Sequence, residues 1–496
     1  MANQYKASLY NYFFNSINAI LIIVNGIVMV PVYFHYMSVS TYGAWLATGN
    51  VVAMLGLLEG GFSFVITQKL SEAISRNNWE RFQILSGSNI LSALFISITI
   101  MILGLCVAPF IADWVNVDVE VSSDIRIAFI LSLLATCISI FVNLFGAFPQ
   151  VWQDTKKVGI FNTIANISAI VVLILLLFWG LGVISIALSY VVRSTLTLVL
   201  NGSWIVKNWK IKKCPRPLFS LRDTALLTKD CAYPLLSKVA GTIVGNSQSF
   251  IIAHFLNPGL AAIYDLTSKI CMVACGFVSQ MNGSFFALFS LTLAEGNKEK
   301  TDKVMYNTTM FYVTLLGCTV LYSICFTEPI IHYWVGLDKF GGTWLLILLV
   351  LAKIVAQMRT YFNSILYTGG LINLSAKWDI LWMMTYIFIL LAIVNNTQIY
   401  AVPIATLVSC LIFIWVYLRL MKTKLFLDIR MIIYVSLRIF ALIIPYAILH
   451  FTLAPDYHNI YCYILYILAF SICFMATLFS TNKTFFKQVL SKIKKS

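Results

Sequence analysis

Charged side chains are scarce in this sequence. Of its 496 residues, 11% are Asp, Glu, Lys or Arg, whereas 60% are hydrophobic. A soluble domain cannot hide so much apolar surface and still present a polar exterior to water. The composition therefore predicts a protein that crosses a membrane several times.

Motifs for catalysis, metal binding and secretion are also missing. The 11 cysteines lie mostly inside apolar runs, and the closest pair, Cys271 and Cys275, has helical spacing, so we interpret them as packing residues. Asp118 and Glu120 form an isolated acidic pair without a Gly-rich phosphate loop nearby. The apolar run after Lys6 has no small-residue cleavage site and is not a signal peptide. We expect a transporter rather than an enzyme, with no metal.

The basic residues indicate topology. The net charge is +15, but Lys and Arg are concentrated in every second loop, and cytoplasmic loops of membrane proteins are enriched in these residues. The positive charge is therefore explained by topology, and we expect no nucleic acid partner. This predicts an all-α polytopic protein of about fourteen helices with both termini in the cytoplasm. The apolar runs begin near residues 12, 43, 84, 125, 158, 183, 231, 260, 305, 343, 378, 399, 431 and 459.

The chain also shows an internal repeat at an offset of 219 residues. His35 pairs with His254 at this offset, and Trp45 pairs with Tyr264. Six helices in each copy make a parallel repeat, with a site between the copies. We predict four parts: an N-lobe at 1–206, a basic cytoplasmic linker at 207–229, a C-lobe at 230–425, and a helix pair with a basic cytoplasmic tail at 426–496.

Polar residues inside the apolar runs are the candidate site, because a charged group in mid-bilayer usually faces a bundle interior or a cavity. Two stripes stand out, Asn11 to Asn25 on the first helix and Lys238 to Ser249 on the seventh, and helix packing is the alternative reading of both. Candidate substrate-binding residues are Lys238, Lys269, Lys353, Arg193, Arg359, Asn18, Asn25, Asn50 and Asn246. Candidate ion-coupling residues are Glu59 and Asp265, for which solvation and pairing with Lys269 are the respective alternatives. Cations exceed acids among these residues, so an anionic guest is expected.

The second apolar run resembles a known family. Tyr42-Gly43-Ala44-Trp45 and the stretch from Leu57 to Phe62 are similar to the second helix of the polysaccharide transporters, the Wzx-type O-antigen flippases of the multidrug/oligosaccharidyl-lipid/polysaccharide (MOP) superfamily. The resemblance implies a MATE-like fold of two six-helix lobes plus a helix pair. It also implies translocation of an undecaprenyl-pyrophosphate-linked oligosaccharide, such as an O-antigen unit, across the bacterial inner membrane.

Partners and rival functions follow from this resemblance. We expect contact with the lipid-linked oligosaccharide and with membrane lipid, a monomer, and no cofactor; other polysaccharide-assembly proteins, and a proton or sodium gradient as driving force, stay open. A MATE-like antiporter of drugs or organic cations is the first alternative, although such a guest calls for buried carboxylates. A membrane glycosyl polymerase or ligase is the second, although the large outer loop expected of one is missing.

Overall fold

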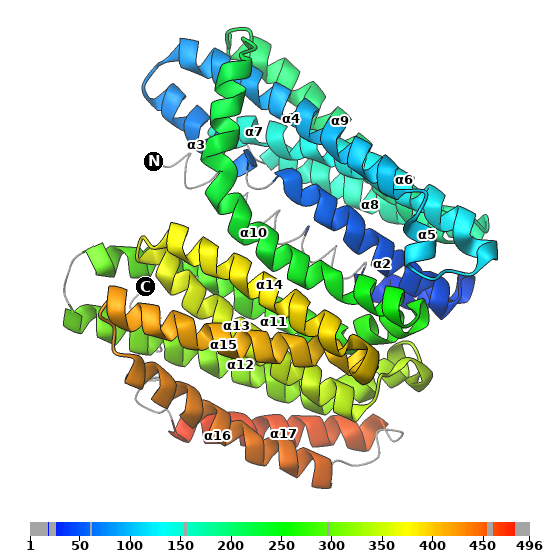
Figure 1. Ribbon diagram of the computed structural model, residues 1–496, viewed down its shortest axis with the longest axis vertical. Helices are drawn as coiled ribbons and strands as arrows, with labels where there is room; N and C mark the ends of the chain where they lie inside the picture. The colour runs from blue at the N-terminus through cyan, green and yellow to red at the C-terminus, as the bar shows by residue number, and fades with distance from the viewer. Residues whose placement is uncertain are drawn as a thin grey trace. The chain divides into compact units, whose positions relative to one another are not determined.

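A computed structural model describes residues 18, 26–59, 62–152, 156–294, 298–453 and 460–481, without the side chains of 58, 64, 75, 229–238, 280–294, 300, 372, 460 and 481. Throughout these ranges the regular structure is helical, and no strand occurs in them. Figure 1 shows most of the helices as long rods, while α10 bends along its length. The predicted all-α class is confirmed.

The helices follow the apolar runs of the sequence. Their bounds are α2 (Val39–Leu55), η1 (Gly56–Glu59), α3 (Phe62–Ser75), α4 (Trp79–Val107), α5 (Ile111–Trp114), α6 (Val119–Phe145), α7 (Ala147–Val151), α8 (Lys156–Phe178), α9 (Val183–Ile211), α10 (Leu221–Phe255), α11 (Pro258–Ala294), α12 (Lys298–Trp334), η2 (Leu337–Lys339), α13 (Thr343–Thr368), α14 (Ile372–Thr397), η3 (Gln398–Tyr400), α15 (Ala401–Lys424), α16 (Ile429–Leu453) and α17 (Ile460–Thr481). A shorter apolar helix, Gly26–Tyr36, precedes α2.

Most of these helices are long enough to span a membrane. Among the described residues, 10 helical segments are long and apolar enough, and one of them, Asn373–Lys424, contains both α14 and α15. All the predicted runs after the first coincide with a helix, while the first lies largely outside the described residues. The second predicted span differs in one respect, because the short 3-10 helix η1 separates α2 from α3. The chain is therefore a multi-pass membrane protein.

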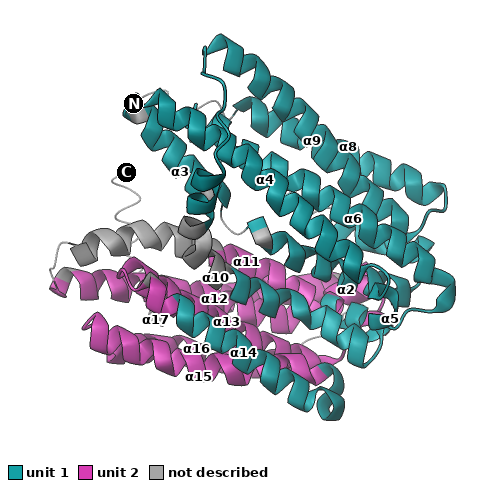
Figure 2. Cartoon of the chain, turned by 45° about the horizontal axis from the view of Figure 1, so that its top comes forward, with its two compact units in different colours: residues 1–265, 376–399 teal, residues 266–375, 400–496 magenta. Residues whose placement is uncertain are grey.

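Contacts divide the chain into two compact units, which are coloured separately in Figure 2. Unit 1 comprises residues 1–265 and 376–399, and unit 2 comprises 266–375 and 400–496. In unit 1, α9 packs against both α6 and α8, and α10 packs against α2 and α4. In unit 2, α13 packs against α15, and α12 packs against α16. Contact thus groups α10 with unit 1, and the lobe boundaries at 206 and 230 stay a prediction.

Helix starts recur at the spacing of the predicted repeat. The starts of α2 and α11 are 219 residues apart, and so are those of α4 and α12. The same cap recurs as well: Ser38 Oγ accepts a hydrogen bond from Thr41 N at 3.1 Å, and Asn257 Oδ1 accepts one from Leu260 N at 2.7 Å. A side-chain oxygen at this position satisfies an amide that the first helical turn leaves open.

The connection between α9 and α10 lies against the start of α4. It is shorter than the predicted linker, because α9 continues to Ile211 and α10 begins at Leu221. Leu218 N donates to Gln83 O at 3.0 Å. A Cβ at Gly87 would lie 2.0 Å from Leu218 O, so only glycine allows this approach.

An ion pair holds the end of the same connection. Arg81 Nη1 lies 2.7 Å from Asp223 Oδ1, and Ser220 Oγ donates to the second oxygen of that carboxylate at 2.7 Å. The hydrogen bonds from Ser220 and then from Arg81 lower the pKa of Asp223, because they stabilise its charged form. The basic segment is therefore anchored to unit 1 by polar contacts.

Candidate functional site

The polar stripe of the first helix is described at Asn18 alone. Its side-chain Oδ1 accepts a hydrogen bond from Asn166 Nδ2 at 2.7 Å and from Thr163 Oγ1 at 3.4 Å, and both donors lie on α8. Asn18 thus joins the first helix to α8, which is the packing role weighed for this stripe. Asn25 falls outside the described residues, and the cavity-lining role of both asparagines stays a prediction.

Glu59 sits in η1, where the second predicted span is interrupted. Its side chain is half-buried, and its Oε2 accepts a hydrogen bond from Asn143 Nδ2 on α6 at 2.9 Å. The carboxylate is therefore bonded to protein and only partly buried. Asn143 was missed in the sequence, although an asparagine near the end of an apolar run is the signal that would have found it.

The other candidates in unit 1 are spread over several helices. Asn50 on α2, Arg193 on α9 and Asn246 on α10 are each half-buried. Asp265, also half-buried, stands near enough to Tyr42 of α2 to interact with it electrostatically. Lys238 is on α10, and its side chain is outside the described part. The shared role of these residues stays a prediction.

Lys353 of unit 2 lies at the junction of α13 with α11. Its ammonium interacts electrostatically with the Cys271 and Cys275 thiols, whose sulfurs are 3.9 Å apart. Both cysteines are buried, and their interpretation as packing residues stays a prediction. Lys269 is half-buried on α11 and also has interactions with neighbouring groups.

Arg359 is the most deeply buried of the described candidates. Its side chain is 6% exposed, and its Nη1 donates to Tyr417 Oη at 3.3 Å, which links α13 to α15. A guanidinium used in this way holds two helices together. Whether it also meets a substrate stays a prediction.

A buried polar network on α13 was not predicted. Gln357 Oε1 accepts hydrogen bonds from Tyr312 Oη and Ser279 Oγ, both at 3.1 Å, so it ties α13 to α12 and α11. One turn later, Tyr361 Oη lies 2.9 Å from Thr309 Oγ1. Lys353, Gln357 and Tyr361 are spaced four residues apart and share one face of α13. That spacing was the available signal in the sequence.

Buried acids are more frequent than the sequence indicated. Asp379 is 2% exposed inside α14, which begins at Ile372 rather than near residue 378, and Glu328 is half-buried on α12. Neither acid was expected in the interior of a span, because each stands close to an end of a predicted apolar run. Together with Glu59 and Asp265, they bring the number of such acids to four, so the excess of cations is smaller than the sequence indicated.

Comparisons with known proteins agree with this architecture. The family model described as "Polysaccharide biosynthesis protein" matches residues 6–293, which is more than half of the chain. A search of curated sequences gave no match. A structure of the lipid II flippase MurJ in an inward closed conformation has a TM-score of 0.67 at 14% identity, covering 96% of this chain and 99% of that one.

Two transporter structures are also similar. An inward-facing multidrug resistance MATE family transporter of the MOP superfamily has a TM-score of 0.61 at 14% identity, covering 85% of this chain and 98% of its own. A eukaryotic MATE transporter has a TM-score of 0.57 at 13% identity, covering 88% of this chain and 100% of its own. These structural similarities establish the fold, and the match to the family model establishes the family. The chain is a member of the polysaccharide biosynthesis protein family, built on the fold that MurJ and the MATE transporters share.

Proposed function

We propose that this protein is a flippase that moves an undecaprenyl-pyrophosphate-linked oligosaccharide across the bacterial inner membrane. Membership in the polysaccharide biosynthesis protein family is the observation that carries the proposal. Its fold likeness to a lipid flippase, MurJ, supports a transport role. The substrate class itself rests on the sequence resemblance to O-antigen flippases.

The physical task explains the mixture of residues in the spans. A glycan and a pyrophosphate lose hydration in hydrocarbon, so they need polar and cationic groups along their path, whereas a polyprenyl tail can stay in lipid. Alternating access of two lobes would provide such a path. Lys238, Lys269 and Lys353 are the proposed ligands of the head group, with Arg193 contributing from the first lobe.

Orientation completes the proposal. Basic loops alternate along the sequence, and basic loops remain in the cytoplasm. Both termini are then cytoplasmic, and the head group enters from the inner leaflet.

The test is complementation of a flippase-deficient strain. The Lys238→Ala/Lys269→Ala/Lys353→Ala variant should abolish surface glycan display while it still accumulates in the membrane, because affinity for an anion follows charge. Lys238→Arg should be milder than Lys238→Ala. The matched control is Lys210→Ala/Lys422→Ala/Lys424→Ala, which removes the same charge from exposed helix ends. Full display by the first triple variant would refute the anionic head-group site.

Export of an organic cation is the second candidate, and Asp379 favours it. A cationic guest requires a buried carboxylate, and Asp379 is buried. If wild-type protein fails to restore glycan display but confers resistance to cationic dyes, and Asp379→Asn removes that resistance, this second function replaces the first.

A further inference from the structure

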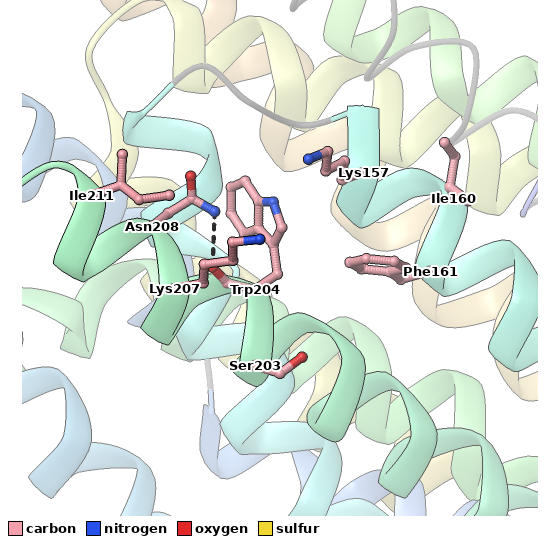
Figure 3. Close-up of a pocket in the computed structure, with 8 residues that line it drawn as sticks. All are labelled: Lys157, Ile160, Phe161, Ser203, Trp204, Lys207, Asn208 and Ile211. Atoms are coloured by element: carbon pink, nitrogen blue, oxygen red, sulfur yellow. Dashed lines mark hydrogen bonds between the residues drawn. The ribbon is translucent and has the colours of Figure 1, made fainter.

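A pocket of about 650 Å³ opens between the start of α8 and the end of α9, within unit 1 (Figure 3). Lys157, Ile160 and Phe161 line it from α8, and Trp204, Lys207 and Ile211 line it from α9. None of the predicted substrate-binding residues is among its lining residues. The pocket therefore calls for an explanation of its own.

One part of the pocket suits an anion. Lys157 and Lys207 supply a cation from each helix, and no carboxylate is among the lining residues. The Trp204 side chain is 6% exposed, and its buried indole Nε1 has no hydrogen-bond partner. A buried N–H without an acceptor is unfavourable, so it marks a place where an oxygen atom would be stabilised. Figure 3 shows this indole between the two lysine side chains.

The polar groups next to the pocket make other contacts and do not occupy the space between Lys157, Lys207 and the indole N–H. Lys212, which follows on the same chain segment, lies 6.0 Å from the centre of the Trp152 ring, in a cation–π contact. Asn208 Nδ2 donates to Trp204 O at 2.9 Å. The two lysines and the indole N–H thus remain as the donors that a guest would meet.

The other part of the pocket is apolar and continues along α8. Ile160 belongs to a row of exposed side chains whose further members are Ile164, Ile167, Val171 and Leu175. Their spacing of three or four residues places them on one face of the helix. At about 1.5 Å per residue, this row is about 22 Å long, which exceeds the roughly 15 Å hydrocarbon depth of one leaflet. An acyl chain can lie along it while a head group occupies the pocket.

We propose that this pocket binds the phosphate head group of an anionic phospholipid, with the acyl chains along the exposed face of α8. Basic pockets between membrane helices recognise such head groups through charge and hydrogen bonding together. The apolar row distinguishes a lipid from free phosphate, which would gain nothing from it. None of the proposed ligands of the flippase head group lines this pocket, so its lipid would act as a bound partner of the α8–α9 pair and not as cargo.

Native mass spectrometry of the delipidated full-length protein tests this assignment. The probes are phosphatidylglycerol, phosphatidylcholine with the same acyl chains, and inorganic phosphate. Each lysine near a phosphate contributes about 1 kcal/mol, so Lys157→Ala/Lys207→Ala should weaken phosphatidylglycerol binding by roughly tenfold or more. Lys422→Ala/Lys424→Ala, which removes the same charge from exposed positions on α15, should leave binding within about twofold.

A second variant separates recognition from folding. Trp204→Phe keeps an aromatic ring and removes the indole N–H, so it should weaken phosphatidylglycerol binding about two- to fivefold and leave phosphatidylcholine unchanged. Equal binding of the two lipids by wild type, or equal losses in the pocket and control variants, would overturn the proposal. Inorganic phosphate that binds as tightly as phosphatidylglycerol would overturn the lipid assignment. Glycan display is not needed for this readout, so the outcome is independent of the flippase test.

Discussion

α8 and α13 are both long, apolar helices, yet they use their surfaces in opposite ways. Of the apolar window of α8, 22% is buried, against 56% for α13. α8 presents a row of exposed aliphatic residues, whereas α13 turns Gln357 and Arg359 toward neighbouring helices. The comparison shows that an apolar run predicts a membrane-spanning helix, but not whether that helix is packed against other helices or exposed on the outside of the bundle.

The difference has a physical cause. Lipid chains are as apolar as leucine, so aliphatic side chains gain little by leaving lipid for protein. Polar side chains gain more, because a partner replaces the water that hydrocarbon lacks. Gln357 therefore fixes which face of α13 is buried, and Asn166 does the same for α8.

The largest expected effect concerns the buried face of α13. Gln357→Leu keeps a similar volume but removes the side-chain hydrogen bonds to the Tyr312 hydroxyl and to Ser279, which keep only the backbone acceptors Gln357 O and Cys275 O. At about 0.5–1.5 kcal/mol for each hydrogen bond, the free energy of unfolding should fall by about 1–3 kcal/mol. Unfolding in mixed micelles measures it. Ile164→Leu on the exposed face of α8 is the matched control and should change stability very little. Equal effects of the two changes would break the comparison.

A smaller effect is expected on the packed face of α8. Asn166→Leu removes the donor to Asn18, and polar contacts of this kind between membrane helices contribute about 0.6 kcal/mol on average. A double-mutant cycle with Asn18→Leu, read by the same unfolding assay, isolates the pair. Strictly additive losses would show that the two asparagines are not coupled.

The smallest effect belongs to the polar connection outside the spans. The lowered pKa of Asp223 means that its carboxylate stabilises the folded state above its unfolded-state pKa of about 3.9, and this stabilisation is lost as the pH falls through the lower folded-state pKa. Because the pair is partly exposed, about 0.2–1 kcal/mol is expected. The stability difference between wild type and Asp223→Asn should shrink from pH 7 toward about pH 3. A difference that does not vary with pH would exclude the ion pair.

Several structural details exceeded what the sequence could predict. The break at η1 places Glu59 beside Asn143, and an apolar run alone does not reveal such a break. The sequence predicts a span that begins near residue 378, whereas α14 begins at Ile372 and buries Asp379 within it. Helix boundaries set by nearby charges are shifted easily, since a helix can extend beyond its apolar part into water.

The sequence by itself determined the membrane class, the positions of the described spans and the family, because composition, run length and local motifs are properties of neighbouring residues. It also marked the polar residues Asn18 and Arg359 as unusual. Only the tertiary structure decided that Asn18 meets Asn166, that Arg359 meets Tyr417, and that Lys157 and Lys207 share a pocket with an indole N–H. Such partners depend on how each helix is rotated about its axis and which helix lies beside it, and both are set by packing between distant parts of the chain.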